Sequence, residues 1–277
     1  MSARLRVSVL VIGDEILGGF VQDTNSGWIA QRLQRVGVPL DRIVTVPDES
    51  EAVAQALQTE LERARPRVVL TSGGIGSTPD DLTLEAVAAS LGLPLVTEPE
   101  IDRRITQALR WSAGRGAGVT DEHERSMRRM AQVPEGARLL TGGEGLAPGI
   151  AVDVDGGSAT PGGATIVILP GVPAELRRIM VEGVEPELLA GRGIPLHVAE
   201  LTHGYPESTL NPILNRLVAE YPDVHVGSYP GSECLIRLKG PRPRVEEAMA
   251  LVADYVATLD RTPSNAALRT AWQQRWR

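Results

Sequence analysis

The first half of the chain repeats one pattern, in which a short apolar run rich in β-branched residues is followed by an amphipathic stretch of helical length. The apolar runs are Val7 to Ile12 (VSVLVI), Ile43 to Val46 and Val68 to Leu70. The amphipathic stretches run from Asp23 to a stop at Gly37, and from Ser50 to Ala64. Strands separated by helices of this length predict parallel βαβ units, because a parallel crossover needs room for a helix. We therefore expect an α/β fold with a mostly parallel sheet and flanking helices.

The rest of the first domain is predicted to continue this fold with less regularity. Further helices are predicted at Leu84 to Leu91, Ile101 to Trp111 and Glu122 to Gln132. Glycine dominates from Thr141 to Gly163, where we expect two short strands around a hairpin near Gly156-Gly157. Ala164 to Leu169 (ATIVIL) has the continuous apolar character of another strand buried on both faces.

The pattern changes after Pro173, where strands no longer alternate with helices one by one. The predicted order is helix Ala174 to Ala190, strand Leu196 to Thr202, helix Ser208 to Glu220, strands Val224 to Ser228 and Cys234 to Lys239, and helix Arg244 to Leu259. Adjacent strands between helices predict a second, smaller α+β module. We therefore divide the chain into residues 1–173, residues 174–260 and a tail of residues 261–277, which is either a short helix or a frayed end.

Composition excludes several classes of function. The 277 residues are 42% hydrophobic, which is enough to bury a core, and their net charge of −7 argues against a nucleic-acid partner. Among the 28 cationic residues only Lys239 is a lysine, and it follows no glycine run, so P-loop chemistry is excluded. The 4 histidines show no HExxH spacing, which argues against a zinc protease.

The single cysteine and the lack of a long apolar segment indicate the cellular compartment of the protein. Cys234 cannot form an internal disulfide and lies in an apolar strand, so we expect it in the core. No apolar stretch approaches the ~20 residues of a membrane span, and the first residues show no signal-peptide pattern. We expect a cytoplasmic protein that does not bind a membrane.

Three polar or glycine-rich segments follow predicted parallel strands. They are Gly13-Asp14-Glu15, the segment from Ser72 to Ser77, and Pro170-Gly171-Val172-Pro173. In an open parallel sheet, ligands bind outside the carboxyl ends of the strands. These segments should therefore converge on one edge of the sheet and form a ligand site there.

The glycine segment is suited to binding phosphate. Because glycine has no Cβ, a ligand can approach its backbone closely, and successive N–H groups can form an anion-binding concavity. The residues expected to take part are Ser72, Gly73, Gly74, Ile75, Gly76 and Ser77. The alternative is a strand-to-helix turn that merely needs positive φ angles. A Rossmann fingerprint is excluded, because Pro79 stands where the third glycine would be.

Two acidic pairs lie beside this segment. Asp80 and Asp81 follow the glycines, and Asp14 and Glu15 follow the first strand. We expect Thr83 to be the N-cap of the next helix, so that neither Asp80 nor Asp81 is needed there. A divalent cation would relieve the repulsion between neighbouring carboxylates and bridge to a pyrophosphate. The alternatives are an acidic N-cap at Asp81 and a solvent-exposed acidic turn at the first pair.

Arg128-Arg129 can bind phosphate, although a solvated helix face is the commoner explanation. The glycine-rich segment from Gly142 to Gly149 is either a second ligand loop or a hairpin.

Taken together, these motifs resemble those of the competence/damage-inducible protein A (CinA) family. The matching segments are GDEILGGFVQDTN (Gly13 to Asn25), TSGGIGSTPDDLT (Thr71 to Thr83), LAPGI (Leu146 to Ile150) and LPGVPAEL (Leu169 to Leu176). Gly204 to Ser208 is similar to the start of that family's small KH-like module. The resemblance covers roughly residues 5–260 and implies a molybdopterin-binding domain fold for the first domain.

The resemblance also implies an activity. It implies a nucleotide pyrophosphatase that hydrolyses ADP-ribose to AMP and ribose 5-phosphate with a divalent cation such as Mg²⁺, Mn²⁺ or Co²⁺. Longer members continue into a nicotinamide-nucleotide deamidase domain, which this chain does not contain, so that activity is not expected. Ser77 replaces a proline usual in the family, and Gly142-Gly143 stand where Asn-Pro is frequent.

The expected roles can now be assigned. Asp81 and Asp80 would be catalytic, and Asp80, Asp81 and Asp14 would hold the cation. The remaining predicted nucleotide- or phosphate-binding residues are Gly13, Asp14, Glu15, Ser72, Gly73, Gly74, Ile75, Gly76, Ser77, Pro148, Gly149, Pro170 and Gly171. Two alternatives remain: a non-catalytic protein that binds molybdopterin or a nucleotide, and adenylyl transfer to molybdopterin, for which no pterin pocket is recognisable.

Self-association is expected as well. The strands Val224 to Ser228 and Cys234 to Lys239 should leave a sheet edge unless something covers it, and Trp272 and Trp276 in the tail are candidates for that cover. The resemblance suggests self-association, and a two-fold dimer is the commonest closed solution. We therefore expect a homodimer with contacts beyond about residue 174.

Overall fold

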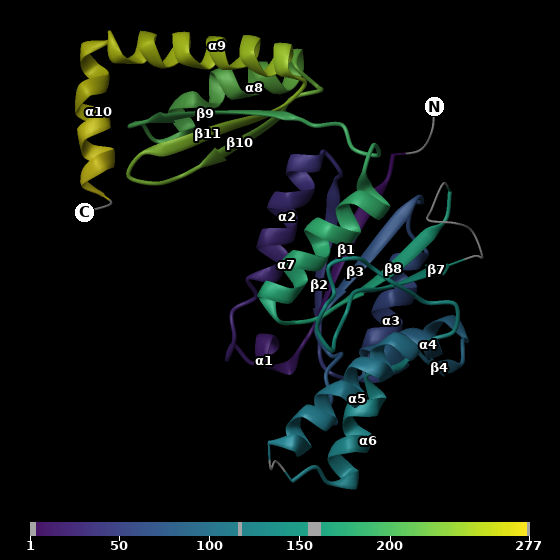
Figure 1. The fold of residues 1–277 in the computed structure, drawn as a ribbon. Helices are drawn as coiled ribbons and strands as arrows, with labels where there is room; N and C mark the ends of the chain where they lie inside the picture. The colour runs from purple at the N-terminus through teal and green to yellow at the C-terminus, as the bar shows by residue number, and fades with distance from the viewer. Residues whose placement is uncertain (1–3, 116–117, 155–161, 276–277) are drawn as a thin grey trace. The chain divides into compact units, whose positions relative to one another are not determined.

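The computed structural model describes residues 4–115, 118–154 and 162–275 (Figure 1). The chain divides into two compact units, with the division between Ile194 and Pro195. None of the described helices combines the length and the apolar character that crossing a membrane requires.

A six-stranded sheet forms the centre of the first unit. Its strands, in spatial order, are β2 (Leu40–Val46), β1 (Arg6–Ile12), β3 (Arg67–Ser72), β8 (Ala164–Leu169), β7 (Ile150–Val154) and β6 (Arg138–Leu139). The first four are mutually parallel, whereas β7 pairs antiparallel with both β8 and β6. The predicted α/β fold with a mostly parallel sheet is therefore confirmed. The expected hairpin at Gly156-Gly157 lies outside the described residues.

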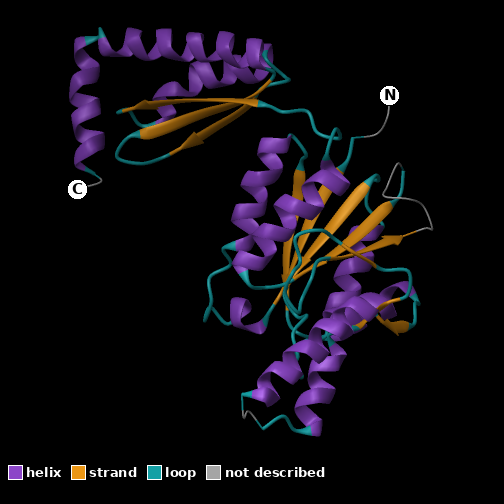
Figure 2. Cartoon of the chain, in the orientation of Figure 1, coloured by secondary structure: helices purple, strands orange, loops and turns teal. Residues whose placement is uncertain are grey.

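Burial along the strands follows from their position in the sheet. All six residues of β3 and all six of β8 are buried, and so are the last six of β1. These strands lie in the interior of the sheet with helices on both faces (Figure 2), which explains their unbroken apolar sequence. The edge strand β2 has exposed residues at Arg42 and Ile43.

Helices on each face complete two separate layers of core. On one face, α2 (Asn25–Val36) contributes Ile29 and Leu33 to a cluster with Val9. On the other face, α3 (Ser50–Leu61) and α4 (Thr83–Leu91) contribute to a second cluster. Burying such side chains is the main favourable contribution to folding. Gly37 ends α2 in the left-handed region with φ 74°, as the sequence indicates.

A helical arm extends from the first unit (Figure 1). It consists of α5 (Pro99–Gly114) and α6 (Asp121–Arg129), and its base is an antiparallel pair of strands, β4 (Leu95–Thr97) and β5 (Gln132–Pro134). Arg128 joins the two helices, because its Nη1 lies 2.5 Å from Asp102 Oδ1 and its Nη2 lies 2.7 Å from Glu124 Oε1. Both helices were predicted, whereas strands of three residues are too short for a periodic signal.

The domain boundary lies later than the expected position near residue 174. Two helical segments follow β8, namely α7 (Pro173–Ile179) and a π-helical segment, η1 (Met180–Leu189). Their buried apolar side chains in the first core are Leu176, Ile179, Met180, Val184, Leu188 and Leu189. The predicted helix therefore exists, but it closes one face of the first sheet instead of opening the second module.

The second unit is a small α+β module, as predicted. A three-stranded antiparallel sheet has the order β10 (His225–Tyr229), β11 (Cys234–Gly240), β9 (His197–His203). The helices of this unit are α8 (Asn211–Glu220), α9 (Arg242–Asp260) and α10 (Pro263–Gln274). Its core includes Leu217, Ile236 and Val245, and Cys234 is fully buried as expected.

Most of the predicted tail is helical, because α10 occupies it. The Nε1–H group of Trp272 donates to the carbonyl oxygen of Gly231 at 3.0 Å, so α10 contacts the turn between β10 and β11. Trp276 lies outside the described residues. The homodimer stays a prediction.

The revised boundary predicts how truncated chains behave. A chain of residues 1–194 should unfold in one cooperative transition with urea, because it retains both layers of core. A chain of residues 1–173 should lack cooperative unfolding, because it loses Leu176, Ile179 and the buried side chains of η1. Circular dichroism during urea titration measures both. Cooperative unfolding of the shorter chain would restore the boundary near residue 174.

Candidate functional site

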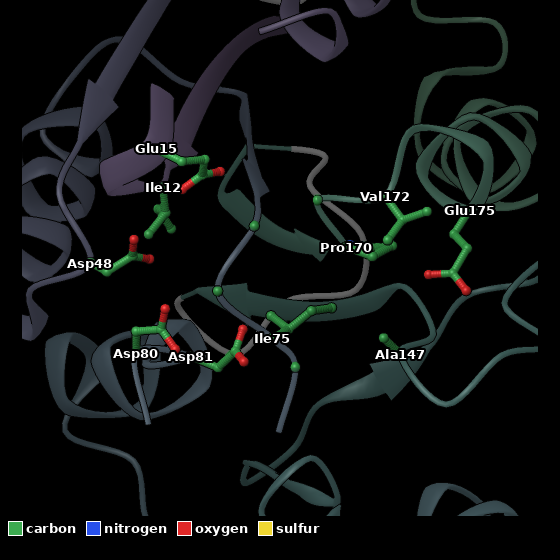
Figure 3. A pocket seen from close by; sticks show the side chains of 14 residues that line it. Ile12, Glu15, Asp48, Ile75, Asp80, Asp81, Ala147, Pro170, Val172 and Glu175 are labelled. Atoms are coloured by element: carbon green, nitrogen blue, oxygen red, sulfur yellow. The ribbon is translucent and has the colours of Figure 1, made fainter. Parts of the chain in front are cut away.

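The carboxyl ends of the four parallel strands carry a pocket of about 320 Å³ (Figure 3). Glu15 follows β1, Asp48 follows β2, Gly73 follows β3 and Pro170 follows β8. The residues lining the pocket are Ile12, Glu15, Asp48, Gly73, Gly74, Ile75, Gly76, Asp80, Asp81, Ala147, Pro170, Gly171, Val172 and Glu175. The predicted convergence of strand-end segments on one edge of the sheet is therefore observed.

The glycine segment is held tightly against β1. Gly73 and Gly74 have φ angles of +106° and +67°. A Cβ on Gly73 would lie 2.3 Å from the carbonyl oxygen of Ile12, so the backbone itself leaves no room for a side chain. Both the conformation and the close approach require glycine. The N–H groups of Gly74, Ile75 and Gly76 donate to no acceptor in the described part of the chain, which leaves them available to an anion.

Thr83 has a different role from the predicted N-cap. Helix α4 begins at Thr83, and the residue before it, Leu82, makes no side-chain cap. The hydroxyl of Thr83 donates to the carbonyl oxygen of Gly73, and its N–H group donates to that of Gly74, both at 2.9 Å. Thr83 therefore fixes the glycine segment instead of capping the helix. The N-cap assignment to Thr83 was wrong, because Thr83 is the first residue of the helix and its hydroxyl donates to the carbonyl oxygen of Gly73.

The two aspartates after the glycine segment differ in their contacts. Asp81 Oδ2 accepts hydrogen bonds from the N–H group of Thr78 at 2.8 Å and from its hydroxyl at 2.5 Å. Asp80 is exposed, and hydrogen bonding with Thr78 holds the pKa of its carboxyl below the ordinary value. We call residues Thr78–Asp81 the acid loop. Asp81 closes this loop, whereas Asp80 is an ionised carboxylate at its surface.

Asp48 is a site residue that the sequence analysis missed. Its Oδ2 accepts the N–H group of Asp14 at 2.8 Å. Burial raises the pKa of the Asp48 carboxyl, and the nearby carboxylates of Glu15, Asp14 and Asp80 raise it further, whereas the hydrogen bond from Asp14 lowers it. A usable signal existed, because Asp48 follows a predicted strand just as Glu15 does.

The other predicted residues divide by position. The expected residues that line the pocket are Glu15, Gly73, Gly74, Ile75, Gly76, Asp80, Asp81, Pro170 and Gly171. The expected residues that lie outside its lining are Gly13, Asp14, Ser72, Ser77, Pro148 and Gly149. Asp14 reaches the site only through its N–H group, and the segment expected to contribute Pro148 contributes Ala147 instead. Glu175, in the first turn of α7, was also missed.

A smaller hollow of about 130 Å³ adjoins the pocket and shares Glu15 and Gly73 with it. Ser72 and Asn25 line this hollow. The Nδ2 group of Asn25 donates to Ser72 Oγ at 3.1 Å and to the carbonyl oxygen of Gly171 at 2.9 Å, which ties the ends of β3 and β8 together. Its Oδ1 is buried and has no hydrogen-bond partner among the described residues, so it can accept one from a ligand.

The charge of the pocket is one-sided. Its acidic lining residues are Glu15, Asp48, Asp80, Asp81 and Glu175, and no arginine, lysine or histidine of the described chain lines it. No group of three or more His, Cys, Asp or Glu side chains within the described ranges is close enough to hold a metal ion. Carboxylates are the ligands that Mg²⁺-like cations prefer, and such ions usually take further oxygens from a phosphate. A cation bound at these carboxylates would therefore need further oxygen ligands from a phosphorylated ligand or from water.

Comparisons with known proteins agree with this architecture. A family profile described as a probable molybdopterin binding domain matches residues 8–190. A protein of Pyrobaculum calidifontis is 36% identical over 225 residues, which cover 80% of this chain and 79% of that one. A CinA-like protein of Citrifermentans bemidjiense is 39% identical over 237 residues, which cover 80% of this chain but 53% of that one. The chain therefore spans about half the length of that CinA-like relative.

A solved structure is similar as well. The crystal structure of the protein CinA from Thermoplasma acidophilum, described as having unknown function, superposes with a TM-score of 0.52 at 29% identity. The match covers 65% of this chain and 96% of that chain.

The glycine geometry predicts the effect of added side chains. Gly73→Ala should lower the free energy of unfolding by at least ~3 kcal/mol, because a left-handed alanine costs roughly 1–2 kcal/mol and the clash with Ile12 adds to it. Gly19→Ala is the matched control, since Gly19 has φ +72° but no atom lies within 4 Å of the position that its Cβ would take. That substitution should cost only ~1 kcal/mol. Urea titration measures both, and equal losses would contradict the close approach.

The environment of Asp48 predicts a pH-dependent stability. The pKa of Asp48 is raised in the folded protein. Such a carboxyl does not affect the free energy of unfolding at a low pH, where it is protonated in both the folded and the unfolded protein. It lowers the free energy of unfolding increasingly as the pH rises through the folded pKa. Asp48→Asn should therefore raise the free energy of unfolding at pH 7 and leave it unchanged near pH 3. The amide oxygen still accepts the N–H group of Asp14. Urea titrations at the two pH values test this, and a lower stability at pH 7 would contradict it.

Proposed function

Because the chain belongs to the CinA-like family and carries that family's molybdopterin-binding domain, we propose that its pocket binds a phosphorylated small molecule together with a divalent cation. The ligand class is a molybdopterin-like compound or a nucleotide. The observation that carries this proposal is the combination of free N–H groups at Gly74–Gly76 with an entirely acidic set of charged side chains around them.

The glycine segment supplies the phosphate contacts. Its free N–H groups can donate to phosphate oxygens, and the missing Cβ atoms let those oxygens approach the backbone. The main-chain donors alone cannot offset five carboxylates around a phosphate, because like charges in a partly desolvated pocket repel. The ligand should therefore bind as a complex with its cation.

The carboxylates supply the cation contacts. Asp80 is the first candidate, since it is ionised and lines the pocket. In Figure 3, Glu15 and Asp48 lie on the same side of the pocket as Asp80, and Glu175 lies on the opposite side. A bound Mg²⁺, Mn²⁺ or Co²⁺ would neutralise charge on the phosphate and lower the pKa of a coordinated water. Asp14, expected as a ligand, keeps only an indirect role through its N–H bond to Asp48.

A second candidate function is hydrolysis of the diphosphate of ADP-ribose to AMP and ribose 5-phosphate. Asp48 favours it, because a carboxylate with a raised pKa in the pocket is better suited than an ordinary one to accept a proton from an attacking water. The water oxygen would bond to one phosphorus, its proton would pass to Asp48, and the other phosphate would leave.

Calorimetry separates binding from turnover. We expect ADP-ribose, FAD or molybdopterin to bind the full chain at least 10-fold more tightly with Mn²⁺ than with a chelator, and AMP to appear when ADP-ribose is incubated with Mn²⁺, Mg²⁺ or Co²⁺. Binding without AMP at high protein concentration would eliminate hydrolysis and leave a binding protein. No binding of any of the three compounds with any of the metals would contradict the proposed function itself.

Single substitutions assign the acidic residues. Asp80→Asn should lower Mn²⁺-dependent binding or AMP formation at least 100-fold. It should lower stability less than Asp81→Asn does, because Asp80 is exposed and solvent screens its hydrogen bond with Thr78. Asp81→Asn should lower both activity and stability, the latter by ~1 kcal/mol, because it weakens the two bonds to Thr78. Asp14→Asn is the control and should retain activity. Equal losses in Asp80→Asn and Asp14→Asn would contradict the assignment.

A further inference from the structure

An arginine of the helical arm contacts the acid loop beside the pocket. Arg129, the last residue of α6, donates from Nη2 to the carbonyl oxygen of Asp81 at 3.0 Å and from Nη1 to that of Thr78 at 3.4 Å. Nη2 also lies 3.1 Å from Glu85 Oε1 on α4. One guanidinium group therefore contacts both ends of the acid loop and the helix that follows it. These contacts use neither carboxylate of the acid loop, and both Asp80 and Asp81 line the pocket.

A second arginine of the arm makes the same kind of contact with the glycine-rich segment that precedes Ala147. Arg104 of α5 donates from Nη1 to the carbonyl oxygens of Gly143 and Gly145, the second at 3.0 Å. Its Nε donates to Glu100 at 2.8 Å, which fixes the guanidinium on the arm. The glycine-rich segment held in this way leads directly to Ala147, which lines the pocket.

The arm is anchored well enough to serve as a support. Ile101 and Ile105 of α5 are fully buried in the cluster to which α3 and α4 contribute, and Arg128 joins α5 to α6. By contrast, the hydrogen bonds within the acid loop join only Thr78 to Asp80 and Asp81. Two adjacent carboxylates repel one another, and a guanidinium on the loop carbonyls opposes a displacement of the loop.

We propose that Arg129 is a positioning residue, which holds the acid loop so that Asp80 and Asp81 face the pocket as a pre-arranged cation-binding pair. Arg104 does the same for the segment that carries Ala147. The arm thus fixes the acid loop and this segment through main-chain carbonyls. This inference rests on the proposed function, because it assigns the purpose of the held loop to cation binding.

The test compares three substitutions in the full chain. Arg129→Gln removes the charge and the fork of donors, whereas Arg129→Lys keeps the charge but cannot reach two carbonyls and a carboxylate at once. Arg125→Gln is the matched control, since Arg125 is exposed on the same helix and has no hydrogen bond or ion pair within the described part of the chain. Hydrogen exchange over residues 76–83 reports the loop, and the electron paramagnetic resonance signal of Mn²⁺ reports cation binding.

Arg129→Gln should speed exchange over residues 76–83 at least 10-fold and raise the Mn²⁺ dissociation constant at least 10-fold. Arg129→Lys should fall between it and the wild type, and Arg125→Gln should match the wild type. With ADP-ribose as substrate, the Mn²⁺ concentration needed for half activity should rise while kcat at saturating Mn²⁺ is retained. This separation distinguishes positioning from a general loss of structure, which would lower kcat as well.

Two results would overturn the inference, and they differ from one another. If Arg129→Gln binds Mn²⁺ as tightly as the wild type, with or without faster exchange, Arg129 does not position the cation ligands and the proposed function stands. If the wild type binds no Mn²⁺ even with ADP-ribose, FAD or molybdopterin present, both the proposed function and the positioning role fail.

Discussion

The approach of Gly73 to the carbonyl oxygen of Ile12 is the constraint on which the site depends. It brings the end of β3 against the end of β1 with no side chain between them, and only glycine allows both this distance and the left-handed conformation. Thr83 then fixes the segment by donating to the carbonyl oxygens of Gly73 and Gly74. Because the carbonyl oxygens point to Thr83, the following N–H groups are left for a ligand. Packing and binding are therefore consequences of the same local geometry.

The strand ends explain why much of the site could be predicted from the sequence. Parallel strands bring their carboxyl ends to one edge, so the residues directly after them, such as Glu15, Gly73 and Pro170, were placed correctly without knowledge of any contact. The same rule would have included Asp48, had the segment after β2 been considered. Asp14 shows the limit of the rule, because adjacent residues point in different directions and only the structure shows which one faces the pocket.

Contacts between distant segments could not be predicted in this way. Arg129 lies 48 positions from Asp81, and Arg104 lies 41 positions from Gly145, and an arginine on a polar helix face looks the same in sequence whether it is solvated or bound to a carbonyl. The position predicted for the domain boundary was wrong for a related reason. The sequence pattern identifies the segment after β8 as helical. It does not show whether apolar residues such as Leu176 pack against the first sheet or the second, because that depends on the packing of the whole unit.

Charged side chains are paired at one end of the central sheet and lack cationic partners at the other. This contrast is the strongest physical reason to place the functional site at the second end. At the amino end, Arg67 and Glu60 are buried but paired. Arg67 Nη2 lies 3.0 Å from Asp41 Oδ2, and Glu60 Oε2 accepts the hydroxyl of Ser8 at 2.5 Å. Buried charges persist in a fold when each has its partner.

At the carboxyl end, five carboxylates line one pocket, and no cationic side chain of the described chain lines it with them. Such an unbalanced group costs stability, and the raised pKa of Asp48 is one expression of that cost. These carboxylates lack cationic partners and yet lie in a loop that Thr78, Thr83 and the arm hold in place, which supports the proposal that the pocket binds a cation and its ligand.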